Sequence, residues 1–328
     1  MHVLMTPTFQ GHTMKRLLLL AALLACSLTA QAQFPNKPLR AVVAYGTGGA
    51  TDVIARIIAA AMSQSLGQPV VIDNRPGADG IIAGDLVTKA APDGYTVFFA
   101  TSTQVSALPS LRKSVPFDPI ADLAPIGGIG NFGFFYAVSN DLPVRTMKEL
   151  AEYGRANPDK LNVASSSASA TIAPTLMMTA EKFRMQVIPY KSEATAINDL
   201  ATGRVQVMVI TGTLAQFVRD GRVRGLATLL PARSKMLPDL PTMAEVGMAP
   251  FPAVPWMGLF GPAKMPKEAV DRLSRALQEV LQKPEVREQI ERQAMDVRFM
   301  PAEAMGTLAK EQTDVWRRIT REAGHVPE

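Results

Sequence analysis

A glycine-rich segment near the start of the chain has the residue types and spacing best suited to binding chemistry. It runs Ala-Tyr-Gly-Thr-Gly-Gly-Ala-Thr-Asp from Ala44 to Asp52, between an expected strand over Leu39–Ala44 and an expected helix over Val53–Leu66. Thr51 or Asp52 is the expected cap of that helix. Free backbone amides at a helix N-terminus, with the positive end of the helix dipole behind them, bind anions without a cationic side chain. The segment therefore favours a small carboxylate or phosphate ligand, with a purely structural turn as an equally good explanation.

Cysteine and histidine, which many catalytic and metal sites use, are scarce in this chain. Cys26 is the only cysteine, and the histidines are His2, His12 and His325. All but His325 fall in the leader described below, and His325 lies in a tail that we expect to fray. These counts disfavour a thiol nucleophile, a Ser-His-Asp triad and a zinc or iron centre. We therefore predict that the protein is not an enzyme and that it uses no cofactor and no metal.

The first 32 residues read as a secretory leader. Lys15 and Arg16 form a basic start, Leu17–Leu24 opens an apolar run too short to cross a membrane, and Ala30-Gln31-Ala32 matches an A-x-A cleavage site. We predict export and cleavage after Ala32. A lipoprotein signal that ends at Cys26 is the alternative, but the clean A-x-A site argues against it.

The charge of the chain gives little support to a nucleic-acid partner. Removal of the leader lowers the formal net charge from +5 to +3, because the leader holds two basic residues and no acidic one. The remaining chain has no arginine-rich run and no interleaving of basic and aromatic residues. We predict that it binds no nucleic acid.

Strands and short helices alternate over most of the remaining chain, a pattern typical of a mostly parallel sheet covered by helices on both faces. Ligands of such folds bind beyond the carboxyl ends of the strands. Three candidate binding loops have this position, namely Gly48-Gly49, Thr101-Ser102-Thr103 and Ser165 to Ser169. The sequence therefore predicts an α/β fold, and the 296 residues after the leader favour two domains over one.

The expected elements follow from turn residues and hydrophobic spacing. Strands are expected over residues 69–73, 95–100, 161–164, 186–190, 205–210 and 225–229, and helices over 81–90, 146–155, 174–182 and 193–202. Residues 126–138 read as a strand that crosses between the two domains. After Pro266, Val270, Leu273 and Leu277 recur at the spacing of an amphipathic helix, which indicates core packing.

Motifs along nearly the whole mature chain resemble one known family. They are Phe34–Arg40, Gly48–Asp52 with Ala55-Arg56, Leu66–Ala78, Ala90–Thr96, Pro189-Tyr190-Lys191, Asn198-Asp199-Leu200, Pro238–Thr242 and Trp256-Met257-Gly258. In order and spacing they resemble the periplasmic solute-binding proteins of tripartite tricarboxylate transporters, also called the Bug family. Each motif is weak alone, and together they are specific.

The resemblance implies a two-lobed type II periplasmic binding-protein fold, each lobe a mostly parallel sheet flanked by helices. Lobe I would comprise residues 33–135 with 231–328, and lobe II residues 136–230. The implied function is a periplasmic, monomeric receptor that captures a small carboxylated compound between the lobes and delivers it to membrane permease subunits. A sensor subunit that presents its ligand to a membrane signalling protein is the alternative, because both share a closed, liganded state.

In this family backbone amides, hydroxyls and bridging waters hold the ligand carboxylate between loops of the two lobes. Carried over to this chain, the first loop is Tyr45 to Asp52 and the facing loop is Ser165 to Thr171, which are also loops that the strand-end argument selects. The expected ligand-binding residues are Tyr45, Thr47, Gly48, Gly49, Ala50, Thr51, Thr101, Ser102, Ser165, Ser166, Ser167, Ser169, Tyr190 and Lys191.

Several residues depart from the family pattern or have plainer explanations. Glu193 stands where glycine is common, and it would repel a second ligand carboxylate if it faced the cleft. Gly46 replaces a frequent proline, and Gln206 replaces a frequent acid. Asp52 and Arg56 are spaced for an ordinary i, i+4 ion pair on a helix. The serines after position 164 could simply cap the next helix, and Trp256 reads as packing.

Overall fold

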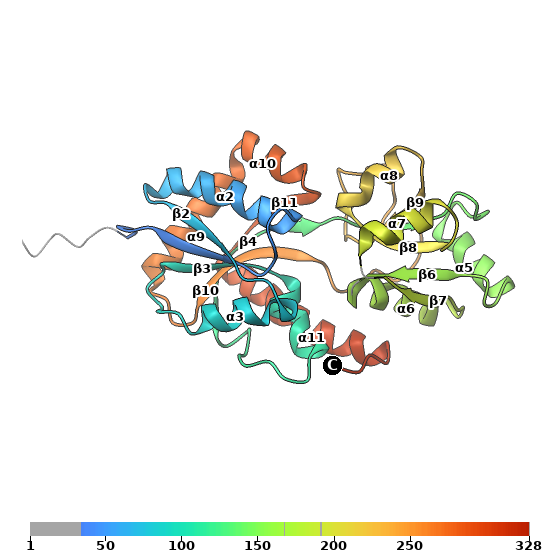
Figure 1. The fold of residues 1–328 in the computed structure, drawn as a ribbon, viewed down its shortest axis with the longest axis horizontal. Coiled ribbons are helices and arrows are strands. Elements are labelled where there is room, and N and C mark those ends of the chain that lie inside the picture. The colour runs from blue at the N-terminus through green and yellow to red at the C-terminus, as the bar shows by residue number, and fades with distance from the viewer. Residues whose placement is uncertain (1–33, 167, 191, 328) are drawn as a thin grey trace, which may run out of the picture. The chain divides into compact units, whose positions relative to one another are not determined.

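The computed structural model describes residues 34–166, 168–190 and 192–327 (Figure 1). The predicted leader, residues 1–32, with its cleavage site after Ala32, lies outside these residues. All the elements below belong to one unit, Lys37–Glu328. Within the described residues, no helix has the length and apolar character needed to cross a membrane.

Two separate sheets organise this unit. The first has six strands in the order β11-β4-β10-β3-β1-β2. Its strands are β1 (Leu39–Val43), β2 (Val70–Asn74), β3 (Thr96–Thr101), β4 (Leu123–Phe132), β10 (Trp256–Pro262) and β11 (Met295–Pro301). The second has five strands in the order β7-β6-β8-β5-β9. Its strands are β5 (Phe134–Val138), β6 (Asn162–Ser165), β7 (Gln186–Pro189), β8 (Val207–Thr211) and β9 (Arg224–Thr228).

Helices cover both faces of each sheet (Figure 1). Those of the first sheet are α2 (Ala50–Leu66), α3 (Ile81–Thr88), α4 (Leu108–Leu111), α9 (Lys267–Gln282), α10 (Pro284–Glu291) and α11 (Ala302–Glu322), with short turns η1 (Ala78–Gly80) and η2 (Thr103–Ala107). Those of the second are α5 (Met147–Ala156), α6 (Ala168–Glu181), α7 (Glu193–Ala201), α8 (Ala215–Arg219) and η3 (Gly212–Leu214). The predicted α/β class is confirmed by these two sheets and their flanking helices.

Each sheet is mixed, whereas the sequence predicted mostly parallel sheets. In the first sheet β1 pairs in parallel with β2 and β3, but β10 is antiparallel to β3 and β4, and β11 to β4. In the second, β6 is parallel to β7 and β8, and β5 is antiparallel to β8 and β9. The βαβ units supply the parallel pairs, and strands that arrive from the other sheet or from the C-terminal helices supply the antiparallel ones.

The strand predicted to cross between domains is present, divided in two by a glycine. β4 ends at Phe132 and β5 begins at Phe134, so only Gly133 separates the two sheets along this segment. The amide of Gly133 donates to the carbonyl of Ala294 at 3.0 Å, and the Gly133 carbonyl accepts from Gly212 at 2.8 Å. A side chain at this position would meet the Met236 methyl group at 2.5 Å. Hydrogen bonds to Ala294 and Gly212 therefore fix the backbone of Gly133 where the chain crosses between the sheets.

Alternating residues of β5 enter two different cores, as the two-residue period of a strand requires. Tyr136 and Val138 pack with residues of α5, α6 and α11, whereas Phe135 and Ala137 pack with residues of α7 and β8. Trp316 and Ile319, late in α11, belong to the first of these cores. Trp256 is 2% exposed in the core of the six-stranded sheet, as its interpretation as packing predicted.

Helix starts are where the sequence prediction fails most. α2 begins at Ala50, not at Val53, and its N-cap is Gly49, which makes no side-chain cap bond. Thr51 and Asp52 are thus inside the first turn and neither is the cap. α6 begins at Ala168 and continues through Pro174, which the sequence prediction placed at the helix start. Ser102 and Thr103 enter the turn η2 rather than an open loop.

Candidate functional site

One cavity, with a volume of about 710 Å³, is lined by residues of both sheets. The six-stranded sheet and its helices contribute residues around the N-terminus of α2, the end of β3 and the end of α4. The five-stranded sheet contributes residues around the ends of β6 and β8 and the start of α7. The polar side chains among them are Tyr45, Thr51, Asp79, Thr101, Ser102, Thr103, Arg112, Ser166, Thr171, Glu193, Thr211, Thr213 and His325.

The start of α2 brings backbone donors to this cavity. Ala50 and Thr51 both line it, and they are the first residues of the helix, so their amides have no acceptor within the helix. The dipole of a 17-residue helix stands behind them. The helix start therefore has the free amides from which the sequence predicts an anion site, and the anion site itself stays a prediction.

Asp52 fixes the loop that precedes α2. Its side chain is 2% exposed, and Oδ2 accepts the Gly48 amide at 2.9 Å and Arg56 Nε at 3.0 Å, while Oδ1 accepts Asn74 Nδ2 at 2.8 Å. Burial raises the pKa of Asp52, but the bonds from Arg56, Gly48 and Asn74 outweigh it and hold the pKa below its usual value. The predicted Asp52–Arg56 ion pair is confirmed, and the Gly48 amide is already occupied.

A buried glutamine that no sequence pattern singles out positions the hydroxyl groups beside α2. Gln104 is fully buried. Its Oε1 accepts both the amide and the hydroxyl of Thr101, at 2.9 and 2.8 Å, and its Nε2 donates to the Tyr45 hydroxyl at 3.1 Å. The Tyr45 and Thr101 hydroxyls are themselves 3.0 Å apart. Gln104 therefore holds two cavity-lining hydroxyls in fixed positions.

An ion pair that the sequence prediction missed also lines the cavity. Arg112, which caps the end of α4, pairs with Asp79 in η1, and its Nε lies 2.9 Å from Asp79 Oδ2. The two residues are 33 positions apart in the chain, so no local pattern relates them. Because the pair is internally neutral, Arg112 adds hydrogen-bond donors to this side of the cavity more than net charge.

The side formed by the five-stranded sheet is hydroxyl-rich and carries one carboxylate. Glu193, the first residue of α7, accepts the Thr211 amide at 2.7 Å and the Thr211 hydroxyl at 2.8 Å. The Thr213 hydroxyl lies 2.6 Å from that of Thr211. Burial raises the pKa of Glu193 more than the Thr211 bonds lower it. The sequence alone leaves open whether Glu193 faces the cleft. In the structure Glu193 lines the cavity.

The expected binding residues fall into three groups. Those that line the cavity are Tyr45, Ala50, Thr51, Thr101, Ser102 and Ser166. Those that do not line it are Thr47, Gly48 and Gly49, which are exposed, and Ser165 and Tyr190. Ser167 and Lys191, and the side chain of Ser169, lie outside what the structure describes.

Ser165 and Tyr190 have structural partners instead. Ser165 is buried, and its hydroxyl is hydrogen-bonded to that of Thr171. The Tyr190 hydroxyl donates to Asp199 Oδ2 at 2.9 Å, and its ring packs against the core between β5 and α7. Burial and the bond to Asp199 raise the pKa of Tyr190. These contacts account for both residues without a ligand.

His325, which we expected in a frayed tail, lies in a different place in the structure. His325 lines the cavity, and its amide donates to the Thr320 carbonyl at 2.9 Å after the end of α11. Its Nε2 atom is buried and makes no hydrogen bond to any described residue. The sequence prediction failed here because proximity to a chain end says nothing about where the end packs.

The donors of this cavity suit an anion. Its donors are amides at a helix N-terminus, hydroxyls and one guanidinium, a set that binds a carboxylate through several hydrogen bonds. Across the described ranges, no group of three or more His, Cys, Asp or Glu side chains is arranged to hold a metal ion. The donors that line the cavity therefore favour the binding of an anion.

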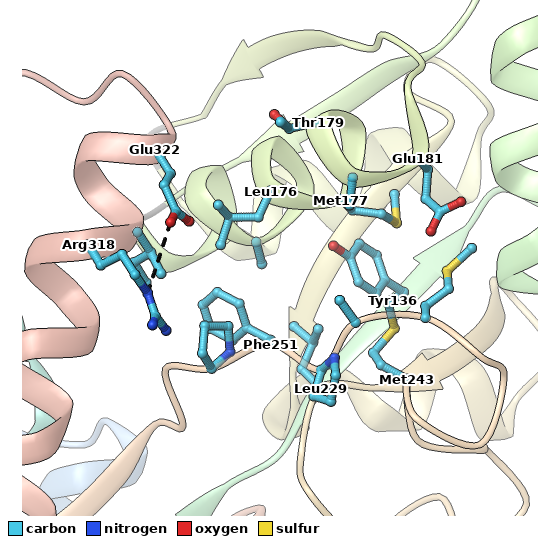
Figure 2. Close-up of a pocket in the computed structure, with 17 residues that line it drawn as sticks. Tyr136, Leu176, Met177, Thr179, Glu181, Leu229, Met243, Phe251, Arg318 and Glu322 are labelled. Carbon is cyan, nitrogen blue, oxygen red and sulfur yellow. Dashed lines mark ion pairs between the residues drawn. The ribbon is translucent and has the colours of Figure 1, made fainter.

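A second, smaller cavity of about 390 Å³ is far more apolar (Figure 2). Leu176 and Met177 of α6 face Leu229, Met243 and Phe251 across it, with the Tyr136 ring at its side. Its arginine, Arg318, is already paired with Glu322, at 4.0 Å. A carboxylate would lose its hydration here and gain few donors, which is unfavourable. Of these two cavities, the one lined from both sheets therefore suits a carboxylate better.

Comparisons with known proteins match one family along most of the chain. Residues 54–325 match the model of the tripartite tricarboxylate transporter family receptor. The chain is 32% identical to the protein BugT of Bordetella pertussis over 296 residues, which cover 89% of this chain and 90% of BugT.

Solved structures confirm the predicted periplasmic-binding-protein fold. The periplasmic binding protein BugD is similar at 33% identity and a TM-score of 0.73, and the match covers 90% of this chain and all of BugD. The R. palustris protein Rpa4515, solved with adipate, is similar at 28% identity and a TM-score of 0.77, and the match covers 90% of this chain and all of Rpa4515.

Proposed function

The chain belongs to the tripartite tricarboxylate transporter receptor family, and from this premise we propose that it captures one small carboxylated compound and delivers it to the membrane permease of such a transporter. The family is one of solute-binding receptors, not of enzymes. The receptor acts in the periplasm as a monomer, after removal of residues 1–32. Relatives that are periplasmic binding proteins support this location.

The observation that carries the proposal is the cavity lined from both sheets. One side offers the first-turn amides of α2 and the hydroxyls of Tyr45 and Thr101, and the other offers Ser166 and Thr211. A carboxylate held at the first side can therefore be reached by donors from the second. The relative solved with adipate supports a carboxylate as the ligand class.

The sheets also support the assignment of two lobes. Residues 33–135 with 231–328 form lobe I, and residues 136–230 form lobe II. All strands of the six-stranded sheet fall in the first set, and β6, β7, β8 and β9 fall in the second. β5 begins at Phe134, two residues before the proposed boundary, because the chain has already crossed at Gly133.

A screen by thermal shift tests the ligand class. Mono-, di-, tri- and aromatic carboxylates are added to the mature protein, residues 33–328, and each is compared with its uncharged amide or alcohol. We expect at least one carboxylate to raise the melting temperature in a concentration-dependent manner, because a ligand that binds only the folded state stabilises it. The bound compound should be recovered chemically unchanged after long incubation. Stabilisation by the uncharged analogues alone would contradict the proposal.

A further inference from the structure

The charged groups of the larger cavity are distributed unevenly between its two sides. The side formed by the six-stranded sheet holds the first-turn amides of α2 and the neutral pair Arg112–Asp79. On the side formed by the five-stranded sheet, Glu193 is the one charged residue among the described residues that line the cavity. The remaining titratable groups of the lining are Tyr45 and His325.

Glu193 is fixed in its position rather than free to turn away. Its two carboxylate oxygens are bonded to the amide and the hydroxyl of Thr211, one to each. Ser192 caps α7 directly before it by accepting the Thr195 amide at 3.2 Å, so the backbone that carries Glu193 is also held. Among the described residues, no lysine or arginine forms an ion pair with Glu193.

A ligand that spans the cavity therefore meets different chemistry at its two ends. A carboxylate fits the α2 end, where donors converge. A second carboxylate at the Glu193 end would place two like charges in one partly buried site, and both could not stay ionised without a large energetic cost. A protonated amine at that end would instead find a carboxylate with which to pair.

We propose that this receptor selects zwitterionic aminocarboxylates, with the carboxylate at the N-terminus of α2 and the ammonium group against Glu193, over dicarboxylates of the same length. The inference rests on the proposed function, since it assigns the carboxylate to the same cavity. It gives Glu193 the role of the specificity-determining residue. The volume of the cavity, about 710 Å³, is ample for either class of ligand, so charge rather than size makes the selection.

Matched pairs of probes test this selection by isothermal titration at pH 7.5. The pairs are succinate with 3-aminopropanoate, glutarate with 4-aminobutanoate and adipate with 5-aminopentanoate, and within each pair an ammonium replaces one carboxylate on the same methylene chain. We expect at least one aminocarboxylate to bind the native protein ten times more tightly than its dicarboxylate partner. In the Glu193→Gln variant we expect the ratio of the two affinities, aminocarboxylate over dicarboxylate, to fall at least tenfold. Glutamine cannot form an ion pair with the ammonium group, and it no longer repels a carboxylate.

Glu152→Gln is the matched control, because it removes the same charge from an exposed position on α5, a helix that flanks the same sheet. The ratio of the two affinities in this variant should equal that of the native protein. A native protein that prefers dicarboxylates overturns the inference and leaves the proposed function standing. Absence of binding by every probe overturns it too, and the thermal-shift screen then decides the proposed function separately. If Glu193→Gln does not fold, the preference of the native protein still decides the inference.

Discussion

At the scale of single residues, two buried polar side chains give the cavity its shape. Asp52 holds the glycine loop before α2, and Gln104 holds the hydroxyls of Tyr45 and Thr101. Neither lines the cavity. Each is almost fully buried and bonded through both of its polar atoms. Such networks are costly to break, since loss of one member removes several hydrogen bonds at once.

Replacement of Asp52 tests this role. Asp52→Ala removes the acceptor of the Gly48 amide and one of the two acceptors of Asn74 Nδ2, so we expect a loss of about 1–3 kcal/mol in the free energy of unfolding, measured by urea denaturation. Asp271→Ala is the control, because Asp271 forms an exposed i, i+4 pair with Lys267. That change should cost less than about 0.5 kcal/mol. Equal losses in the two variants would contradict the role of Asp52.

The contribution of Asp52 should also depend on pH. Burial raises its pKa, but bonds from Arg56, Gly48 and Asn74 outweigh burial, so the folded pKa lies below the ordinary 3.8. The unfolded state therefore binds the proton more readily, and the stability from Asp52 is present above pH 3.8 and lost as the pH falls through the folded pKa. The gap in melting temperature between native protein and Asp52→Ala should stay constant from pH 7 to 5 and narrow below pH 3.8. A difference in melting temperature that widens in acid would mean that folding raises the pKa of Asp52 instead of lowering it.

The neighbouring serines Ser165 and Ser166 should separate stability from binding. Ser166 lines the cavity, so Ser166→Ala should remove one hydrogen bond to a charged ligand, worth about 1.5–3 kcal/mol, and weaken binding tenfold or more. Bridging water would keep the loss near the lower figure. Ser165 is bonded to Thr171 instead, so Ser165→Ala should lower the melting temperature and leave the affinity unchanged. Calorimetric titration and thermal melting of both variants distinguish the two roles. Weaker binding in Ser165→Ala with native affinity in Ser166→Ala would contradict this assignment.

At the scale of elements, the sequence predicts which segments form strands and helices better than where they begin. Hydrophobic spacing correctly indicates α9, because burial of one helix face leaves a periodic pattern in the sequence. The crossing segment that becomes β4 and β5 is indicated instead by a largely apolar run, because β5 is buried on both faces. The start of α2 leaves no such trace, since Gly49 caps the helix without a side-chain bond. Pro174 misleads for α6, because its fixed φ suits a helix start but is tolerated here inside the helix.

Contacts between distant elements are beyond prediction from one sequence. The loops at strand ends indicate the neighbourhood of the cavity, and Tyr45, Thr51, Thr101 and Ser166 do line it. Arg112 and His325 reach it through tertiary packing, and Gln104 positions two of its hydroxyls from behind the lining, and no local pattern encodes either relation. Glu193 was identified as a departure from the family, but its orientation required the structure. Sequence patterns therefore give the loops, and packing decides which side chains of those loops face the cavity.

A close approach between strands β4 and β11 gives a prediction at this scale. A Cβ atom at Gly130 would lie 2.3 Å from the backbone carbonyl oxygen of Asp296, which cannot move without a shift of the paired strand. We expect Gly130→Ala to destabilise the protein by about 1–3 kcal/mol in chemical denaturation. Gly46→Ala is the control, because a Cβ there has no neighbour within 4 Å. It should change the free energy of unfolding by less than about 0.5 kcal/mol, and a similar loss in both variants would contradict the packing argument.

At the scale of the whole molecule, the cavity draws its lining from both sheets, and the chain passes between them at Gly133 and again between β9 and β10. A ligand that bonds to both sides would draw them together. We expect the radius of gyration of the mature protein, measured by small-angle X-ray scattering, to fall when a carboxylate from the screen saturates it. The same concentration of sodium chloride should have no effect. An unchanged radius at saturation would count against a hinged receptor.

The central claim is that a ligand carboxylate binds the free amides at the start of α2. Gly49→Asp tests it, because Gly49 has an extended backbone (φ −75°, ψ 161°) and open space around its Cβ position, so the substitution fits the fold. Aspartate is a favoured N-cap, and its carboxylate would take the amides that the ligand needs while it preserves or raises stability. Gln278→Glu adds the same charge at an exposed position of α9 and serves as the control.

Isothermal titration with the tightest carboxylate from the screen is the deciding measurement. We predict that the native protein and Gln278→Glu bind one equivalent with the same affinity. Gly49→Asp should bind at least ten times more weakly at an unchanged or higher melting temperature. Native affinity in Gly49→Asp would contradict the claim, because it would mean that the glycine segment is only a turn and that the carboxylate binds elsewhere.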